Sequence, residues 1–284
     1  MNCTLCPRKC GVDRTVRPGA CHTLADMKIC RIAPHFYEEP PISGKKGSGT
    51  IFFSGCSLDC EFCQNYEISK KSVGKTYTPA MLADAMRSLE KTGVHNINLV
   101  TPTHFSDKIK QALDLYRPAI PIVYNTAGYE LPDVVRSLLP YVDIFLVDLK
   151  YSDNVLAEKY SNARNYVENC LSSIDVMVDN KPLVFEGEFM KQGVIVRHLV
   201  LPGETENTLK VIETFKERYL DRAYLSVMSQ FVPEYHSSIH RTLSPLEYKI
   251  VLRRLFNLGS DKCFVQELSS ASSEFIPPFD LSDE

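Results

Sequence analysis

The chain has 284 residues, 44% of them hydrophobic, and a formal net charge of -3 with a pI near 6.2. This length supports one large core, and the charge leaves no excess of basic residues to neutralise phosphates, so we expect no nucleic-acid partner. The first residues lack the apolar segment of a secretion signal, and no run reaches the roughly 18 apolar residues of a membrane span. We therefore expect a cytoplasmic protein without a membrane partner.

The cysteines are concentrated near the start of the chain, where eight of the ten lie within the first 63 residues. In a protein without a secretion signal, clustered cysteines are typical of metal ligands rather than of disulfides. Cys30, Cys170 and Cys263 stand apart from the other cysteines, and we expect them to be buried as small apolar residues.

Residues 1–47 are predicted to form a Cys-rich N-terminal extension and loop. Four thiols fall within 19 residues, at Cys3, Cys6, Cys10 and Cys21, in a segment with too few apolar residues to fold by burial alone. Their number predicts a metal site in addition to the one described below, either zinc or an iron-sulfur cluster. Redox-active or simply reduced thiols are the alternative.

The stretch 38–50, EEPPISGKKGSGT, is rich in Pro, Gly and Lys. Such a composition opposes regular structure and predicts an ordered loop or a linker. We place the domain boundary near Ser48, so that residues 48–284 form the core barrel with a C-terminal helical and strand extension.

From Thr50 onward, short apolar runs rich in β-branched residues alternate with stretches of helical periodicity. Six strands are predicted, at residues 50–55, 97–101, 121–127, 144–150, 193–202 and 223–231. Helices are predicted between and after them, at residues 78–93, 106–116, 132–142, 205–220 and 245–256. This alternation implies parallel pairing and an α/β barrel, closed or partly closed, with its reactive groups on loops at the C-terminal ends of the strands.

Helix boundaries are readable at two places. Thr78 can cap the first long helix, Pro79 fits its first turn, and Gly93 can end it. Ser244 and Glu247 have the spacing of a capping box before the last helix.

A CxxxCxxC pattern, formed by Cys56, Cys60 and Cys63, directly follows the first predicted strand of the barrel. Three thiolates on one short loop can hold three irons of a cubane cluster and leave the fourth iron open for a substrate or cofactor. Gly55 allows a tight backbone turn next to the loop, and Phe62 supplies an apolar face beside it. A structural zinc site normally needs four protein ligands, and no fourth is near in this pattern.

Polar residues end several of the predicted strands. Alternation along a strand points Asp148 and Lys150 to the same, inward face, where they either pair with each other or meet a polar ligand. Thr101, Asn125 and Arg197 are further candidates for inward polar groups at the ends of their strands.

Three other polar residues are weaker candidates. For His104 and His198, a structural role is at least as well supported as a catalytic one. Gln230, late in the sixth strand, is a candidate for the ligand side of the barrel.

The pattern CxxxCxΦC, with aromatic Phe62 at Φ, resembles the signature of radical S-adenosylmethionine (SAM) enzymes. The segments 38–69, NLVTPTH, YNTAGYE, VDLK and RHLVLPG resemble the pyruvate formate-lyase activating enzyme-like branch over nearly the whole chain. The resemblance implies a partial (β/α)6 barrel and a [4Fe-4S] cluster on the three cysteines, with SAM bound to the unique iron through its amino and carboxylate groups. It also implies a low-potential electron donor of the flavodoxin or ferredoxin type.

The resemblance assigns roles to individual residues. A DxK pattern contributes to SAM binding in the activating enzymes, and it corresponds here to Asp148 and Lys150. Relatives receive the SAM amino group on a GGEP turn, whereas this sequence has Thr101-Pro-Thr-His104, so the ammonium contacts differ. Phe62, Thr101 and Asn125, together with Arg197, complete the expected cofactor-binding set.

The resemblance therefore predicts an oxygen-sensitive oxidoreductase of anaerobic metabolism that cleaves SAM reductively to a 5'-deoxyadenosyl radical. We expect the radical to abstract hydrogen from a protein or peptide, as in a glycyl-radical-enzyme activase. Radical modification of a small molecule or peptide is one alternative, and a non-catalytic iron-sulfur electron carrier is another. The cofactor supplies the difficult chemistry, so no catalytic side chain is expected beyond the cluster and SAM.

Overall fold

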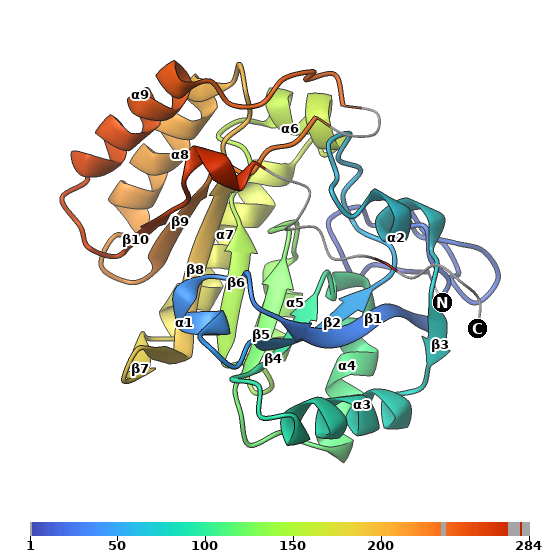
Figure 1. Cartoon of the computed structure of the whole chain (residues 1–284). Helices are drawn as coiled ribbons and strands as arrows, with labels where there is room; N and C mark the ends of the chain where they lie inside the picture. The colour runs from blue at the N-terminus through green and yellow to red at the C-terminus, as the bar shows by residue number, and fades with distance from the viewer. Residues whose placement is uncertain (1, 234–236, 272–278, 280–284) are drawn as a thin grey trace.

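A curved, mostly parallel sheet forms the centre of the molecule in the computed structural model, which describes residues 2–233, 237–271 and 279 (Figure 1). Its strands run in the order β10-β9-β8-β6-β5-β4-β2-β1-β3, with β7 paired to β8. The six strands predicted for the barrel pair side by side in parallel: β2 (Ser48–Phe53), β4 (Ile97–Val100), β5 (Ile122–Thr126), β6 (Ile144–Asp148), β8 (Phe189–Leu199) and β9 (Tyr224–Met228). The expected α/β fold with a partial barrel is confirmed.

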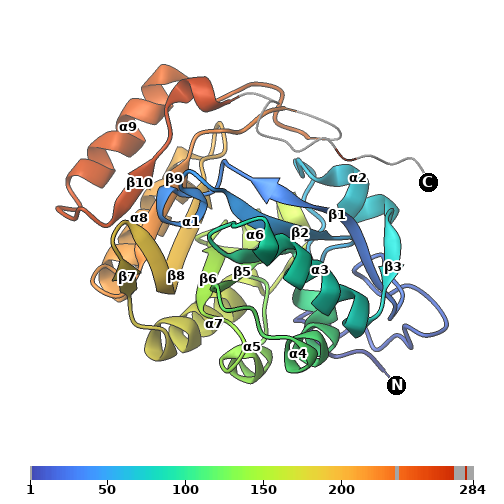
Figure 2. The same ribbon diagram turned by 60° about the horizontal axis from the view of Figure 1, so that its bottom comes forward.

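Helices connect these strands, and Figure 2 shows four of them, α3, α4, α5 and α7, along one side of the sheet. The predicted helices are present as α3 (Pro79–Lys91), α4 (Ser106–Leu115), α5 (Pro132–Leu138), α8 (Thr205–Arg218) and α9 (Pro245–Phe256). The helices α6 (Asn154–Ser161) and α7 (Tyr166–Asn180) were not predicted from the sequence. Each helix buries an apolar face, which is how amphipathic helices cover a parallel sheet.

The predicted helix boundaries follow from local chemistry. The Thr78 hydroxyl accepts a hydrogen bond from the Met81 N–H, which satisfies one of the free amides at the start of α3. Gly93 follows α3 with a φ of +81°, a value that favours glycine. At α9, Ser244 and Glu247 form both hydrogen bonds of a capping box.

The N-terminal range contributes to the same sheet. Strand β1 (Met27–His35) pairs antiparallel with β2 and with the short β3 (Lys75–Tyr77). The proline-rich stretch is more regular than a linker, because Pro40 and Pro41 begin the short helix α1 (Pro40–Ser43), whose first turn tolerates proline.

Five further short elements complete the described chain. They are α2 (Tyr66–Lys71), the 3-10 turn η1 (Thr103–Phe105), β7 (Val184–Glu186), β10 (Cys263–Val265) and the 3-10 turn η2 (Leu268–Ser270). Strand β10 pairs parallel with β9 and extends the sheet at the C-terminal side. No helix in the described part of the chain is long and apolar enough to cross a membrane.

The inner face of the sheet changes character along its strands. Towards their N-terminal ends it is apolar, and Ile42 of α1 packs there against inward residues such as Val123, Leu146 and Ile195. Two residues further along β5, β6 and β8, the same face presents Asn125, Asp148 and Arg197 instead. Because strand side chains alternate with a period of two, these polar groups point to the same side of the sheet as the apolar residues that pack against Ile42.

Candidate functional site

The nine residues predicted to bind the [4Fe-4S] cluster and SAM all line one cavity of about 570 Å³, a volume typical of ligand sites. They reach it from the loop after β2, from the ends of β4, β5 and β6, and from β8. The nine are Cys56, Cys60, Phe62, Cys63, Thr101, Asn125, Asp148, Lys150 and Arg197. The fold brings these nine side chains together around one cavity, and their roles as ligands remain predictions.

The cysteine loop leaves the sheet through a tight turn at Gly55. Its φ is +86°, and a Cβ at this position would lie 2.5 Å from the Cys21 carbonyl oxygen and 2.4 Å from Cγ2 of Thr23. A side chain at residue 55 would therefore displace the N-terminal segment that packs there. Both the positive φ and the close contacts that a Cβ would make therefore favour glycine at this position.

Each of the three sulfurs has a hydrogen-bond donor beside it. The Leu58 N–H donates to Cys56 Sγ over 3.4 Å, and the Ser161 hydroxyl donates to Cys60 Sγ over 2.9 Å. Cys63 Sγ lies 3.3 Å from Ser69 Oγ. Donors aimed at sulfur stabilise the thiolate, which is the form that binds metal.

Without a metal, burial favours the neutral thiols. It raises the pKa of Cys56 to about 12 and that of Cys60 to about 11, and the pKa of Cys63 is also above its usual value. For Cys60 the nearby Lys150 charge opposes the rise in pKa. A metal that binds here must therefore displace protons from all three thiols.

Asp148 lies between two cations in the cavity wall. Its Oδ2 accepts a hydrogen bond from Lys150 Nζ at 2.5 Å, and its Oδ1 accepts one from Arg197 Nε at 2.8 Å. Burial alone would raise the pKa of Asp148, but the charges of Arg197 and Lys150 outweigh it and hold that pKa below its usual value. Of the two arrangements open from sequence, the structure shows pairing, and the paired groups also face the cavity.

Two carboxylates that were not predicted as site residues also line the cavity. Glu38 accepts hydrogen bonds from the side-chain amides of Asn98 and Asn125 and forms a 3.4 Å ion pair with Arg197. The neighbouring Glu39 is buried, and its Oε2 has no hydrogen-bond partner. Burial raises the pKa of both Glu38 and Glu39, and the Arg197 charge opposes that rise.

Thr101 ends β4 in a strained conformation. Its φ is +59°, which a β-branched residue adopts only at a cost of about 1–2 kcal/mol, and its N–H donates to the Asn125 carbonyl over 2.9 Å. Backbone strain of this kind tends to occur at ligand sites. Phe62 packs against Tyr160 and Phe231, which fixes its ring at the cavity wall.

The radical SAM superfamily matches residues 50–215, which is more than half of the chain and includes the three-cysteine loop. The chain belongs to the radical SAM superfamily. It is 30% identical over 272 residues to an uncharacterised protein of Methanocaldococcus jannaschii, covering 90% of this chain and 75% of that protein.

Two further comparisons place the radical SAM chain among known proteins. It is 29% identical over 132 residues to the anaerobic ribonucleoside-triphosphate reductase-activating protein of Vibrio cholerae, covering 41% of this chain and 84% of that one. A solved radical SAM methyltransferase from Sphaerobacter thermophilus has a TM-score of 0.55 at 15% identity, covering 94% of this chain and 88% of that one. At that identity the structural likeness shows the fold alone.

The family implies a [4Fe-4S] cluster and SAM, and the radical SAM site fits both. Three thiols with hydrogen-bond donors lie at one side of a cavity, which suits three irons of a cubane. Asp148, Lys150 and Arg197 line the same cavity as the three cysteines, and they pair with one another there. A zwitterionic amino acid moiety such as that of SAM can be met there by both carboxylate and cationic partners.

The remaining candidates separate into two groups. His198 is fully satisfied, with Nδ1 at 2.7 Å from the Leu149 carbonyl and Nε2 at 2.9 Å from the Thr208 hydroxyl, and it does not line the cavity. His104 is buried outside the cavity, with Nε2 at 2.7 Å from the Ser54 carbonyl and Nδ1 without a hydrogen-bond partner among the described residues. Gln230 lines the cavity, as does Cys263, which was expected to be an ordinary buried cysteine.

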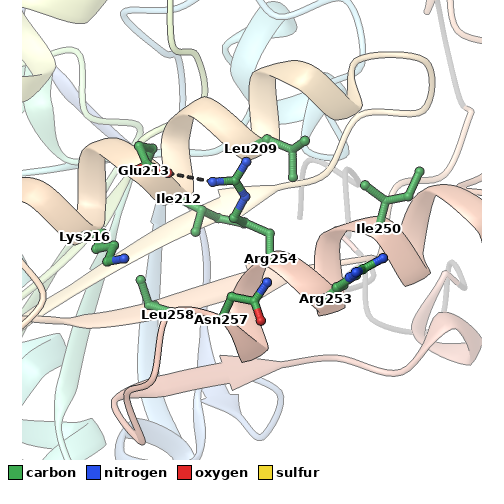
Figure 3. A pocket seen from close by; sticks show the side chains of 9 residues that line it. All are labelled: Leu209, Ile212, Glu213, Lys216, Ile250, Arg253, Arg254, Asn257 and Leu258. Atoms are coloured by element: carbon green, nitrogen blue, oxygen red, sulfur yellow. Dashed lines mark hydrogen bonds and ion pairs between the residues drawn. The ribbon is translucent and has the colours of Figure 1, made fainter.

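The four N-terminal cysteines lie outside the cavity. Among the described residues, no three His, Cys, Asp or Glu side chains converge as ligands of a single ion would, so the second metal remains a prediction. A smaller cavity of about 340 Å³ lies between α8 and α9 (Figure 3), where Arg254 is paired with Glu213. None of the predicted site residues reaches this smaller cavity.

Proposed function

We propose that this radical SAM enzyme cleaves SAM reductively and abstracts a hydrogen atom from a glycine of a protein partner. The observation that carries the proposal is the single cavity in which three cysteine sulfurs adjoin the Asp148-Lys150-Arg197 network. A cluster held by Cys56, Cys60 and Cys63 would supply the electron for reductive cleavage of SAM to methionine and a 5'-deoxyadenosyl radical. Transfer of the glycine hydrogen then yields 5'-deoxyadenosine and a glycyl radical.

In this proposal the chain's own residues bind and orient. Cys56, Cys60 and Cys63 hold the cluster, and Phe62 covers it on the side of the aromatic residues Tyr160 and Phe231. Inward polar groups of the strands bind the polar parts of SAM. These groups are Thr101, Asn125, Asp148, Lys150 and Arg197.

The glycine substrate rests on the similarity to the Vibrio cholerae activating protein, 84% of whose length is matched. The cavity is lined by residues that follow β1, around Tyr37, and residues that follow β10, around Gln266, and in this proposal a substrate loop enters the cavity from outside the chain. An external flavodoxin- or ferredoxin-type protein supplies the electron in this proposal.

The radical step is tested by reconstituting the protein anaerobically, reducing it and adding SAM. We expect release of methionine and 5'-deoxyadenosine, which the Cys60→Ala variant should fail to produce. The Cys30→Ala variant is the matched control, because it also removes one half-buried cysteine but not one from the loop. Product formation by Cys60→Ala at the wild-type rate would refute the assignment of the cluster ligands.

The hydrogen donor is tested separately with the glycine-containing C-terminal loop of an anaerobic ribonucleotide reductase, deuterated at the glycine Cα. Deuterium in the recovered 5'-deoxyadenosine supports the activase. Active SAM cleavage without deuterium transfer would favour modification of a small molecule or of another peptide.

A further inference from the structure

Glu38 and Glu39 lie at the end of the cavity that is next to the apolar core, which we call its inner end. Glu39 directly precedes α1, and Ile42 of that helix packs against the apolar N-terminal parts of the strands, where Figure 1 shows α1 beside β8. Glu38 accepts a hydrogen bond from Asn98, which lies two residues before Val100 on β4. Val100 lines the cavity, whereas Asn98 does not. The cysteine loop follows β2 at the opposite, C-terminal ends of the parallel strands.

The two carboxylates differ in what they contact. Glu38 is satisfied within the chain by two side-chain amides and by Arg197. Glu39 lines the same cavity, is only 9% exposed, and has a buried Oε2 without a hydrogen-bond partner in the described chain. Although Glu39 is the N-cap residue of α1, its side chain makes no capping hydrogen bond. The ion pairs of Arg197 go to Glu38 and Asp148 instead.

Carboxylates outnumber cations among the described residues that line the cavity. The carboxylates are Glu38, Glu39 and Asp148, and the cations are Lys150 and Arg197. His35 also lines the cavity, but burial lowers its pKa and so favours the neutral imidazole. Asp148 pairs with both cations, so the charge of Glu39 is the one left without a partner. A buried carboxylate without a partner is unfavourable, and a ligand that brings a positive charge would compensate it.

The free oxygen of Glu39 fits an organic cation better than a metal ion. Magnesium and calcium take about six or more oxygen ligands, whereas the oxygens of Glu38 are already used by other side chains. An ammonium or guanidinium group needs only an acceptor for one of its N–H groups, and a hydrogen bond between two charged groups is strong.

We propose that Glu39, next to the charge of Glu38, binds an ammonium or guanidinium group of the substrate at the inner end of the cavity. In a protein partner, the side chain of a lysine or an arginine carries this group. The proposal rests on the proposed function, since the substrate is the hydrogen donor that shares the cavity with SAM. It adds that the donor is positively charged near the site of hydrogen transfer.

The test is a binding measurement on the cluster-loaded protein with SAM present and the cluster oxidised, so that no turnover occurs. The probes are n-propylammonium, n-propylguanidinium and neutral n-propanol. In titrations followed by saturation-transfer NMR, wild type should bind one of the two cations about tenfold or more tightly than propanol, and Glu39→Gln should lose this preference. Glu217→Gln changes an exposed glutamate of α8 outside the cavity, so this control should keep the preference.

Two further measurements separate substrate binding from other roles of Glu39. Glutamine has the same size and no charge, so Glu39→Gln should leave the urea midpoint of the ligand-free protein unchanged or raise it at pH 8. A lower midpoint would identify a structural carboxylate and overturn the proposal. The dissociation constant of SAM, measured by equilibrium dialysis, should be the same in Glu39→Gln and wild type. Weaker SAM binding by the variant would assign the cation to SAM instead of the substrate and overturn the proposal as well.

The probes themselves also decide. Equal binding of the cations and propanol by wild type, or an unchanged preference in Glu39→Gln, would overturn the proposal. None of these readouts requires SAM cleavage, so a failure of the proposed hydrogen transfer leaves them interpretable.

Discussion

Arg197 is the side chain on which the charges of the cavity converge. It contacts Asp148, Glu38 and the Asn125 side chain at 2.8, 3.4 and 2.6 Å. Burial alone would lower its pKa, but the neighbouring carboxylates raise that pKa, so the guanidinium stays charged. Asp148 and Glu38 therefore share this buried cation, and Asp148 is also paired with Lys150.

Arg197→Ala should lower the free energy of unfolding by about 3–5 kcal/mol, because it leaves Asp148 and Glu38 buried with less compensating charge. Urea denaturation of the cluster-loaded protein measures the loss. Arg164→Ala is the control: its ion pair with Glu158 is exposed and should contribute less than about 1 kcal/mol. Equal effects of the two variants would contradict the buried network.

Glu130 is a second buried carboxyl, away from the cavity. Its Oε1 accepts hydrogen bonds from the hydroxyls of Thr103 and Thr126, each at 2.5 Å, while its Oε2 has no partner. Burial raises the pKa of Glu130 from 4.5 to about 7, against the effect of these hydrogen bonds. The folded protein therefore prefers the protonated acid.

Because the pKa of Glu130 is higher in the folded than in the unfolded chain, its contribution to stability is fully present below pH 4.5 and is lost as pH rises through 7. The loss amounts to about 3 kcal/mol. Urea midpoints between pH 5 and pH 8 should fall more for wild type than for Glu130→Gln, which carries no titrating proton. Parallel pH profiles would show that Glu130 titrates normally.

At the scale of elements, the start of α9 is fixed by local signals. Ser244 caps the helix, and Glu247 bonds the Gly203 N–H in the loop before α8, so the cap also joins two neighbouring helices. The same signals were readable in the sequence, because a capping box depends only on residues three apart.

Ser244→Ala should lower the free energy of unfolding by about 1 kcal/mol, the usual effect of a lost N-cap. Ser88→Ala is a matched control inside α3, where the hydroxyl only bonds back to the Asp84 carbonyl and alanine is the better helix former. Thermal unfolding of both variants checks the difference. A loss from Ser88→Ala as large as that from Ser244→Ala would argue against a specific cap.

The elements that sequence reasoning missed lack such local signals. Strand β1 pairs with β2, which lies about twenty residues away, and no period of two marks its burial. Glu38 and Glu39 were overlooked because they sit in a proline-rich stretch, and their partners Asn98, Asn125 and Arg197 come from distant strands. Strand alternation, in contrast, places Asp148 and Lys150 on one inward face from sequence alone, and the resemblance to the activating enzymes then predicts a role for them in SAM binding.

At the scale of the whole molecule, the cavity is lined by residues from segments far apart in the chain, from His35 at the end of β1 to Gln266 after β10. Ligand binding to such a site stabilises the entire fold. SAM at 100 times its dissociation constant should add about 2.7 kcal/mol to the free energy of unfolding and raise the melting temperature of the cluster-loaded protein by several degrees. ATP, which shares the adenosine but lacks methionine, should have no effect.

The Asp148→Asn variant should show a smaller thermal shift with SAM than wild type, since it removes the charge that faces Lys150 and Arg197. The comparison is made by differential scanning fluorimetry under anaerobic conditions, each variant against its own SAM-free melting temperature. An identical shift in both proteins would exclude Asp148 from SAM binding.

The sequence separation of the residues that line the cavity also has a consequence for the order in which its parts form during folding. The three cysteines of the loop lie within eight residues, whereas the wall around them runs from His35 to Gln266 and includes the last strands of the sheet. Joining distant segments costs more chain entropy and takes longer than closing a short loop. During synthesis, iron can therefore be captured early, by a chain that is still incomplete, while SAM has no site until the final strands have docked.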